Sequence, residues 1–399
     1  MNRRYTVLMI APTSFFADYG CHVRILEEAL SLRRLGHRVT IATYYQGRPI
    51  ADLDIVRTPP LPWRADYEVG SSRHKLAFDL YLGATVLHSA LRLRRRGLDI
   101  IHAHLHEGAL IGAPIARLLR LPLIFDFQGS LTGEMVDHHF LSPNGPLFNA
   151  MGKLERAINR LPDAVLTSST HARRILEDEF DIPPERVHPL PDCVNAETFC
   201  PPGPDSAAER ARLKEDLGIP AGRPVVIYLG LLADYQGTPQ LIQAAAQLAA
   251  AGVDVHFLIM GYPGHMAYVQ MAQELGIQDR VTLTGRIPYE QAAHFLSLGD
   301  IAVAPKLSST EGSGKVLNYM AMGLPTVAFD TPVQREYLAD LGVYAPPGDL
   351  EAFTAAIRAL LADPERQAEL GAASRQRAIE HYSWERAGRQ IVTIYDQLS

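Results

Sequence analysis

Short apolar runs alternate with amphipathic helical windows along almost the whole chain of 399 residues. Runs such as residues 5–10 and 224–229 have the length of strands and are nearly unbroken hydrophobic stretches, which indicates strands buried on both faces. Helices between such strands imply right-handed crossovers and a parallel sheet. The alternation therefore predicts an α/β fold of the doubly wound type.

This alternation runs twice, which together with the chain length predicts two domains. Residues 1–195 form the first pattern. The second begins after residues 201–210, a segment rich in Pro, Gly and Ser that is the best linker candidate. Two facing sheets would form a cleft, with ligands beyond the carboxyl ends of the strands. The expected strands are 5–10, 38–43, 99–103, 122–127, 163–168, 186–190, 224–229, 253–260, 280–284, 300–304 and 326–329. The expected helices are 21–35, 107–119, 148–160, 171–180, 238–251, 266–275, 289–298, 315–322, 350–362, 365–381 and 384–398.

Charge is distributed unevenly over the two domains. The formal net charge of −6 argues against nucleic-acid binding by the whole surface, and a hydrophobic content of 47% excludes disorder. Residues 1–124 nevertheless carry 17 Lys and Arg against 10 Asp and Glu. A basic first third on an acidic protein indicates an anionic partner for one domain only.

The cysteines and the N-terminus indicate a cytoplasmic chain. Cys21, Cys193 and Cys200 are far apart and form no CxxC pair, and their odd number suits a reducing cytosol. The N-terminal run could imitate a signal peptide, but it ends in Pro12 and polar residues and fits a first buried strand better. The sequence has no apolar span of 18 residues, so we expect no transmembrane helix.

Glycines mark the loop after the first strand of each domain. Gly20 stands where a helix begins, and the free N–H groups of a helix start suit a phosphate or a carboxylate. An ordinary turn glycine is the alternative. In the second domain, Gly230 and Gly237 allow the backbone to approach a ligand closely.

Three alternating histidines, His102, His104 and His106, suggest a metal site. Side chains alternate between the faces of a strand, however, and metal-binding helices prefer i, i+4 spacing, so we expect no metal here. His104 and Glu107 are expected at the strand end, where they would line the cleft. Structural hydrogen bonding is the alternative.

Another polar cluster surrounds the end of the strand 122–127. Asp126 lies inside this apolar run and needs a partner there. Gln128 and Ser130 follow at the expected mouth of the cleft, and this density of polar groups exceeds what a fold needs. Further polar side chains follow within one or two turns at Glu134, Asp137, His138 and His139.

The richest loop lies directly before the helix expected at 315–322. Gly312 and Gly314 leave the backbone free, so that N–H groups can point at a phosphate. Lys315 adds a positive charge in the first helical turn, where it opposes the helix dipole unless an anion lies nearby. A surface turn with a solvated lysine is the alternative. The spacing does not match a P-loop.

With these residues assembled, the chain resembles the family 4 glycosyltransferases of GT-B fold over nearly its whole length. The most specific stretch, residues 319–327, looks like the family's helix–turn–strand signature. In GT-B proteins the last helix crosses back onto the first domain. The resemblance therefore implies an acceptor-side domain of residues 1–195 plus 383–399 and a nucleotide-sugar domain of residues 196–382. It rests further on Ala11, Pro12 and Gly20, and on residues 35–39, 101–104, 190–194, 228–230, 236–237, 281–285 and 381–384.

The resemblance implies a retaining transferase that moves a sugar from a UDP- or GDP-sugar to a glycan, lipid or small-molecule acceptor, without a metal or other cofactor. Lys315 would stabilise the leaving diphosphate, and Glu311 would orient the hydroxyls of the donor sugar. Gln128 and His104 complete the implied catalytic set. The implied donor contacts are Gly20, Gly230, Gln236, Gly237, Gly312, Ser313, Gly314, Asn318 and Tyr319, and the acceptor-side residues are Glu107, Asp126, Ser130 and Glu134.

The chain departs from the family pattern at the diphosphate. Members usually carry an Arg and a Lys at the positions of Leu231 and Gln236, and a His at the position of Gln128. Asn318 matches the second of two family glutamates and can still bond ribose hydroxyls. Lys315 is the obvious substitute cation, which favours a rearranged donor site. A noncatalytic scaffold or regulatory protein and a nucleotide-sugar epimerase remain open alternatives.

The basic first third includes four arginines at the end of a helix that begins near His74 and Lys75. Such a face could make peripheral contact with anionic lipid at the inner side of a membrane, at about 1 kcal/mol per charge. A solvated helix C-terminus favoured by the dipole is the alternative. The four arginines are Arg92, Arg94, Arg95 and Arg96.

Overall fold

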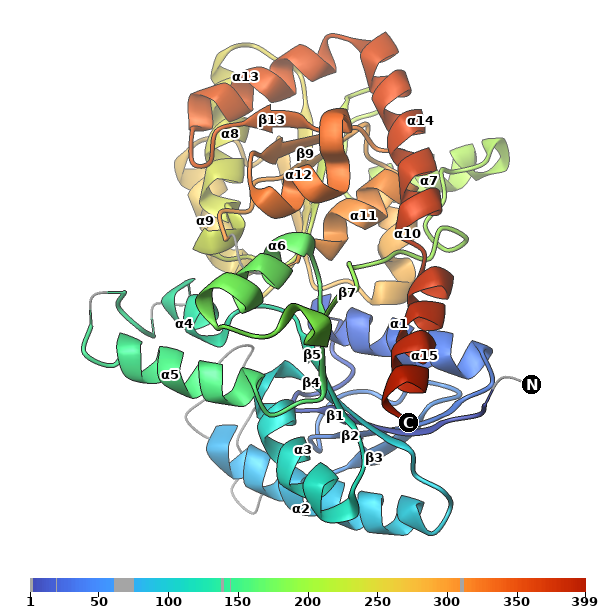
Figure 1. Ribbon diagram of the computed structural model, residues 1–399. Coiled ribbons are helices and arrows are strands. Elements are labelled where there is room, and N and C mark those ends of the chain that lie inside the picture. Colours follow the sequence, from blue (N-terminus) through green and yellow to red (C-terminus); the bar gives the residue numbers. More distant parts are fainter. Residues whose placement is uncertain (1–2, 19, 61–74, 138–139, 144, 309–311) are drawn as a thin grey trace. The chain divides into compact units, whose positions relative to one another are not determined.

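The chain folds into two compact units, each built on one parallel β-sheet (Figure 1). The computed structural model describes residues 3–18, 20–60, 75–137, 140–143, 145–308 and 312–399. The first unit comprises Met1–Asp192, Thr310–Gly312 and Trp384–Ser399, and the second comprises Cys193–Ser309 and Ser313–Ser383. No helix of the described residues is both long enough and apolar enough to span a bilayer.

The segment 201–210, expected as a linker, lies inside the second unit, so that expectation was wrong. Pro204 opens a short 3-10 turn, and α7 (Ala207–Asp216) follows it directly. Proline and serine are favoured at helix starts as well as in linkers, so composition alone could not separate the two.

The sheet of the first unit has seven parallel strands in the order β3-β2-β1-β4-β5-β6-β7. The interior strand β1 pairs with β2 on one side and with β4 on the other. The strand order reverses between β1 and β4, and ligands of such sheets bind beyond the carboxyl ends of the strands at this point. The strands are β1 (Thr6–Ala11), β2 (Arg38–Thr43), β3 (Asp54–Arg57), β4 (Ile100–His104), β5 (Leu123–Phe127), β6 (Ala164–Thr167) and β7 (Val187–Pro189).

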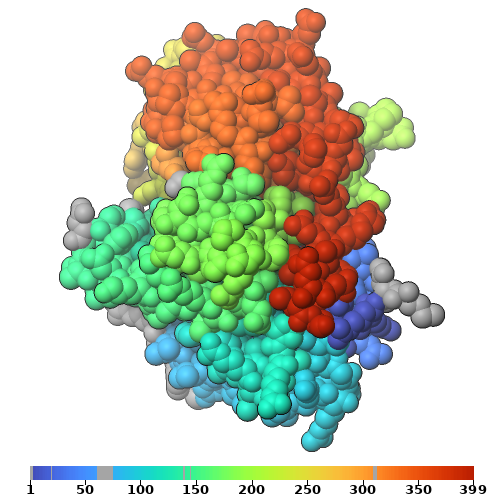
Figure 2. Space-filling view, viewed as in Figure 1, coloured from blue at the N-terminus to red at the C-terminus, as the bar shows by residue number. Residues whose placement is uncertain are grey.

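Helices cover both faces of this sheet, because the crossovers run outward from β1 and β4 in opposite directions. The C-terminal helix α15 packs against α1, and Figure 2 shows it in red beside the blue N-terminal residues. The neighbours α2, α3 and α5 cover the other face. The helices are α1 (Gly20–Arg34), α2 (Lys75–Arg94), α3 (Leu105–Leu119), α4 (Leu131–Asp137), α5 (Phe148–Asn159), α6 (Thr170–Arg174), which continues as a π-helical turn (Ile175–Glu179), and α15 (Trp384–Leu398).

The second unit has a six-stranded parallel sheet in the order β10-β9-β8-β11-β12-β13. Here β8 pairs with both β9 and β11, so the strand order reverses between β8 and β11. The strands are β8 (Val225–Leu229), β9 (His256–Met260), β10 (Val281–Gly285), β11 (Ile301–Ala304), β12 (Thr326–Phe329) and β13 (Val343–Ala345). The helices are α7, α8 (Thr238–Ala250), α9 (His265–Glu274), α10 (Ala292–Leu296), α11 (Gly314–Ala321), α12 (Pro332–Leu338), α13 (Leu350–Leu361) and α14 (Pro364–His381).

The structure confirms the predicted pair of doubly wound parallel sheets. The expected strands and helices are found within about three residues of their predicted ends, because buried strands and amphipathic helices carry strong local patterns. The pattern does not predict the edge strands β3 and β13 or the helices α4, α7 and α12. Both edge strands are short, and most of their residues are half-buried, so they lack an apolar run.

Candidate functional site

The carboxyl ends of β8 and β11 form the expected ligand site of the second unit, because the strand order reverses between them. Residues 230–237 follow β8, residues 305–308 follow β11, and α11 begins at Gly314. Most of the residues expected to contact the donor come from these segments.

Lys315 is held at this edge by side chains from the loop after β8 and from β8 itself. Its Nζ donates to Gln236 Oε1 at 2.8 Å and to the Tyr228 hydroxyl at 3.0 Å. The same Nζ lies 4.4 Å from the centre of the Tyr228 ring. The Tyr228 hydroxyl donates in turn to the Leu231 carbonyl at 2.7 Å, and burial raises the pKa of Tyr228 well above its usual value, so this hydroxyl stays neutral. Leu231 and Gln236, the positions that depart from the family pattern, are thus both connected to Lys315.

Two positions in this loop require glycine. Gly230 has a φ of +155°, and a Cβ atom there would lie 2.8 Å from Lys315 Nζ. Gly237 has a φ of +74°, and its Cβ would collide with the carbonyl oxygen of Pro305 after β11. The approach of Lys315 to the loop therefore depends on glycine at position 230.

Tyr319 is fully buried, and its hydroxyl accepts a hydrogen bond from the Leu229 N–H at 2.8 Å. Burial raises the pKa of Tyr319, so the hydroxyl remains neutral. This contact ties α11 to the end of β8, so the structure gives Tyr319 a positioning role. Asn318 on the same helix is half-buried, one turn after Lys315.

A buried hydroxyl lies directly before the start of α11. Ser313 directly precedes the helix, is 3% exposed, and among the described residues its Oγ has no hydrogen-bond partner. Gly314 is the first residue of the helix, whereas Gly312 is grouped with the first unit. Glu311, expected to orient the donor sugar, lies outside the described residues.

Sequence reasoning missed Lys306, which follows β11 and is 4% exposed. It is a second lysine close to the carboxyl edge at which Lys315 lies. The available signal was a lysine two residues beyond the apolar run predicted as the strand 300–304. Parallel sheets bind ligands beyond the carboxyl ends of their strands, so this position was a candidate for ligand contact.

Arg24 is the centre of a buried ionic network in the first unit. Its Nη2 donates to Asp126 Oδ1 at 2.7 Å and its Nε to Asp126 Oδ2 at 2.9 Å, while Nη1 reaches Asp192 Oδ1 at 3.1 Å. Glu28 Oε1 lies 3.2 Å from Arg24 Nε. Burial alone would raise the pKa of Asp126, but the Arg24 guanidinium holds it well below its usual value. Asp126 thus has the partner that its place in an apolar run required.

Gln128 and His104, both expected as catalytic side chains, contact this carboxylate. Gln128 Nε2 donates to Asp126 Oδ2 at 2.8 Å, and His104 Nδ1 lies 3.1 Å from the same oxygen. His104 is fully buried, whereas Gln128 is half-buried. Asp126 therefore fixes the orientation of Gln128 at the carboxyl end of β5.

Glu28, His102 and His104 bring potential metal ligands within 4.8 Å of one another in the buried core. His102 Nε2 is 3.6 Å from Glu28 Oε2, and His102 Nδ1 is 2.8 Å from the Tyr395 hydroxyl of α15. The Arg24 guanidinium already contacts Glu28, and a cation at that distance repels a divalent metal ion. The cluster is explained better as polar contacts that join α1, β4 and α15.

Ser130 and Glu134 lie at α4, whose start is capped by a residue that the sequence did not reveal. Glu155 is fully buried on α5 and accepts the N–H groups of Leu131 at 2.9 Å and Thr132 at 2.8 Å. The Ser130 hydroxyl donates to Glu155 at 3.2 Å, and Glu134 is half-buried on the helix. A carboxylate at a helix start stabilises the exposed N–H groups and the dipole.

Glu107 and Gly20 lie at the starts of α3 and α1, the helices that follow β4 and β1. Glu107 follows β4 and forms an ion pair with Lys75 at 2.5 Å. Burial alone would raise the pKa of Glu107, but the Lys75 ammonium lowers it below its usual value. Gly20 is the exposed first residue of α1, with open space where a Cβ would lie. His138 and His139 fall outside the described residues.

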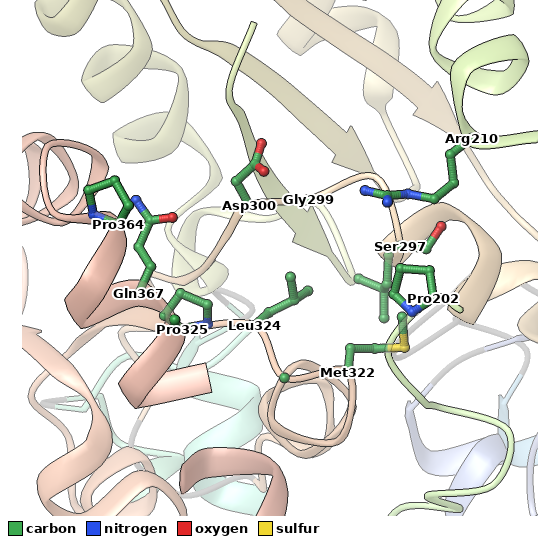
Figure 3. Close-up of a pocket in the computed structure, with 13 residues that line it drawn as sticks. Pro202, Arg210, Ser297, Gly299, Asp300, Met322, Leu324, Pro325, Pro364 and Gln367 are labelled. Atoms are coloured by element: carbon green, nitrogen blue, oxygen red, sulfur yellow. The ribbon is translucent and has the colours of Figure 1, made fainter. Parts of the chain in front are cut away.

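The second unit also has a cavity of about 310 Å³ at the opposite edge of its sheet. Asp300 and Pro325 line it and directly precede β11 and β12, so the cavity lies at the amino ends of these strands. Figure 3 shows the Arg210 side chain extending toward Gly299 at this cavity. The cavity is therefore separate from the lysine at the carboxyl ends.

The polar face of α1 was missed for a specific reason. The apolar spacing of Val23, Leu26, Ala29 and Leu30 predicts them as the inner stripe of α1, but Val23 and Leu30 are only half-buried. Arg24 and Glu28 are buried instead. Their i, i+4 spacing, together with the need of Asp126 for a partner, was the available signal.

Comparisons with known proteins agree with this architecture. Residues 19–193 match the Glycosyl transferase 4-like domain, and residues 209–377 match Glycosyl transferases group 1. The α-D-kanosaminyltransferase of Streptomyces kanamyceticus is 30% identical, over 78% of this chain and 81% of that protein. Sucrose-phosphate synthase from Thermosynechococcus elongatus has a TM-score of 0.82 at 20% identity, covering 99% of both chains. HepE of Anabaena in complex with UDP-glucose has a TM-score of 0.79 at 17% identity, covering 98% of this chain and 100% of that chain.

Two doubly wound sheets and these matches define a glycosyltransferase of GT-B fold. The chain belongs to the family 4 glycosyltransferases, with the 4-like domain in its first unit and the group 1 domain in its second.

Proposed function

We propose that this enzyme is a retaining glycosyltransferase that moves a sugar from a UDP- or GDP-sugar to a glycan, lipid or small-molecule acceptor. The observation that carries the proposal is the Lys315 ammonium, held by Gln236 and Tyr228 at the reversal point of the second sheet. The HepE structure in complex with UDP-glucose, which shares the fold, supports a nucleotide sugar as donor.

Lys315 is proposed to stabilise the charge of the leaving diphosphate. Negative charge grows on the phosphate oxygen as its bond to the anomeric carbon breaks. An ammonium and the N–H groups at the start of a helix supply positive potential there without reorganisation. The buried Ser313 hydroxyl is suited to donate to a phosphate oxygen, and Asn318 to bond the ribose.

Three glycines and Glu311 complete the proposed set of residues that contact the sugar donor. Gly230 and Gly237 are proposed to let the backbone pass close to the donor. Gly20, the first residue of α1, is proposed to contact the donor from that helix start. Glu311 is proposed to orient the hydroxyls of the donor sugar. These roles follow from the family resemblance together with the places of the glycines in the fold.

The first unit is proposed to receive the acceptor at the carboxyl ends of β4 and β5. Gln128, Glu107, Ser130 and Glu134 are the polar side chains near this edge. The buried Asp126 and His104 are proposed to act through Gln128, because both belong to the contact that orients its amide.

No protein base and no metal ion are needed in the proposed reaction. The diphosphate oxygen that leaves the sugar accepts the proton of the acceptor hydroxyl, while the acceptor oxygen bonds to the anomeric carbon. Lys315 supplies the positive charge that a divalent cation would otherwise bring to the diphosphate. Full activity in EDTA is expected, and loss of activity that Mg²⁺ restores would contradict this part of the proposal.

Retention of configuration is supported by one relative. The name of the kanosaminyltransferase specifies an α-D-sugar as the group transferred. Common nucleoside diphosphate hexoses carry an α linkage to phosphate, so an α product would retain it. NMR spectroscopy of the product's anomeric proton tests this point.

We propose the cytoplasm as the working compartment. None of the three cysteines forms a disulfide in the structure, which suits a reducing environment. Nucleotide sugar and acceptor are the proposed partners, and nucleic acid is not among them.

A thermal-shift screen against UDP-, GDP- and ADP-sugars tests the proposal most directly, since a ligand that binds the folded state raises its stability. One donor should raise the unfolding midpoint of the wild-type chain. That shift should be absent in Lys315→Ala and kept in the control Lys214→Ala, a lysine of α7 in the same unit.

Two other outcomes separate the alternatives. Consumption of the nucleotide sugar without any acceptor would indicate an epimerase. Binding of a donor without transfer or hydrolysis, whichever acceptor is offered, would indicate a noncatalytic protein.

A further inference from the structure

The outer surfaces of α2 and α3 carry a set of exposed leucines. On α2, Leu76 is 74% exposed and Leu80 is 70% exposed. Leu87 continues the same stripe two turns after Leu80, and Leu91 one turn after Leu87. At about 100° per residue, the four positions fall within a sector of about 60° around the helix. Leu110 and Leu118 are exposed on the neighbouring helix α3. We call this set the leucine face: Leu76, Leu80, Leu87, Leu91, Leu110 and Leu118.

The leucine face is not needed for the core of the unit. The opposite side of α2 already packs into the sheet through Phe78, Leu82 and Val86, which are fully buried. A surface helix of a water-soluble domain normally presents polar residues to solvent, so a second apolar stripe is unusual. Exposed apolar patches of this kind mark interaction sites.

The exposed charges on the described residues of α2, α3 and the turns that follow them have a single sign. In residues 75–97 and 105–120, every exposed charged side chain is an arginine. The two carboxylates of these segments are half-buried and occupied: Asp79 accepts from the Tyr44 hydroxyl at 2.6 Å, and Glu107 pairs with Lys75 at 2.5 Å. The exposed arginines are Arg92, Arg94, Arg95, Arg96, Arg117 and Arg120.

This composition selects one kind of partner. A second copy of the chain docked face to face would bring two arginine clusters together, which opposes such a dimer. Protein interfaces are enriched in Trp and Tyr and poor in Leu at their energetic centres, and the face has no aromatic residue. Leucine on one side with arginine around it is typical of helices that lie in the interface of an anionic bilayer.

We propose that the leucine face docks the enzyme on the surface of an anionic lipid bilayer. The leucines enter the boundary between headgroups and acyl chains, and the arginines bind lipid phosphates. This inference goes beyond the proposed function, because it is independent of the donor, the acceptor and the transfer chemistry. The sequence left open whether the arginines at the end of α2 contact lipid or solvent. The proposal favours lipid and extends the contact surface to α3.

Co-sedimentation of the full chain with vesicles tests the proposal. The chain should bind vesicles of phosphatidylcholine mixed with phosphatidylserine, bind pure phosphatidylcholine far less, and dissociate at high salt. Leu80→Gln with Leu87→Gln should lower the partition coefficient about tenfold or more, because apolar burial is lost. Arg94→Gln and Arg95→Gln should each lower it by about fivefold.

Matched variants in the second unit serve as controls. Met266→Gln removes an apolar side chain that is 65% exposed, and Arg358→Gln removes an exposed arginine, and both should bind like the wild type. Unchanged unfolding midpoints show that all the variants fold. Equal vesicle binding by the Leu80→Gln, Leu87→Gln variant and the wild type would overturn the proposal. So would a dimer, seen by sedimentation velocity, that this double variant dissociates without any change in vesicle binding.

Discussion

Lys315 Nζ lies 2.8 Å from Gln236 Oε1, although 79 residues separate the two along the chain. Gln236 occupies the position at which family members usually carry a lysine. The ammonium therefore reaches this position from α11 rather than from the loop after β8. A neutral amide with its oxygen toward Lys315 can hold this cation, whereas a second lysine at 236 would repel it.

Replacement of Lys315 by alanine should lower kcat by about 10²–10³-fold, the typical effect of removing one group that stabilises developing charge. Lys315→Arg should recover part of this loss, because the charge returns with a different shape. Steady-state kinetics with the donor found by thermal shift would measure both, with Lys214→Ala as control. Turnover at the wild-type level in Lys315→Ala would show that Lys315 does not act in the reaction and would contradict the proposed function.

Gly230→Ala should displace Lys315 and weaken donor binding. The new Cβ would lie 2.8 Å from Lys315 Nζ, and the φ of +155° disfavours any residue with a side chain. We expect a stability cost of about 1–3 kcal/mol and a smaller thermal shift by the donor. Gly218→Ala is a matched control, since Gly218 also has a positive φ of +69° but open space around it. If both variants bind donor equally well, the close approach has no role in binding.

Tyr319→Phe should destabilise the second unit more than it changes catalysis. The substitution leaves the Leu229 N–H without its side-chain partner, which costs about 1–3 kcal/mol. Urea unfolding and the KM for the donor should be measured together. An increase in KM at unchanged stability would instead show that Tyr319 contacts the donor, as the family resemblance implied.

Stability of the second unit should fall between pH 6.5 and pH 4 because of His256. Burial, with Arg223 nearby, lowers the pKa of this histidine to about 4 from its usual value of 6.5. In this range the unfolded chain binds a proton that the folded chain excludes, so the stabilisation is complete above pH 6.5 and is lost as the pH falls toward 4. His256→Gln keeps a donor toward Thr282 Oγ1, 2.8 Å from Nε2 in the wild type, and cannot titrate. Calorimetry should show a flatter pH dependence in this variant, and an identical dependence would contradict the assignment.

Much of the architecture could be predicted because it depends on local patterns. The strand β2 and the helix α15 have the predicted ends, since an apolar run and a 3.6-residue period can be recognised within one segment. The same logic failed for α1, where Arg24 and Glu28 resemble a solvent-facing pair. They are buried because Asp126 lies opposite on β5, a fact that no local window contains.

The residues of the site could be predicted only where a local feature of the sequence marked them. Lys315 stood out because it opposes a helix dipole, which is a local feature. Glu155, by contrast, is one charged residue on an amphipathic helix, and its role as a cap of α4 exists only after α4 and α5 have packed together. Lys306 follows a predicted strand by two residues, but only the structure shows that it is buried beside the reversal point of the sheet.

By itself, the sequence determined the two doubly wound domains, the family and the loops in which the chemistry should be sought, because each depends on residues close together in the chain. The tertiary structure alone decided which side chains meet. It brought Lys315 to Gln236 and Tyr228, Arg24 to Asp126 and Asp192, and the helix α2 beside α3. These contacts join segments about 80 to 170 residues apart, except for the neighbouring helices α2 and α3. Parallel strands place their carboxyl ends at one edge regardless of separation along the chain, so only the strand order shows which loops become neighbours.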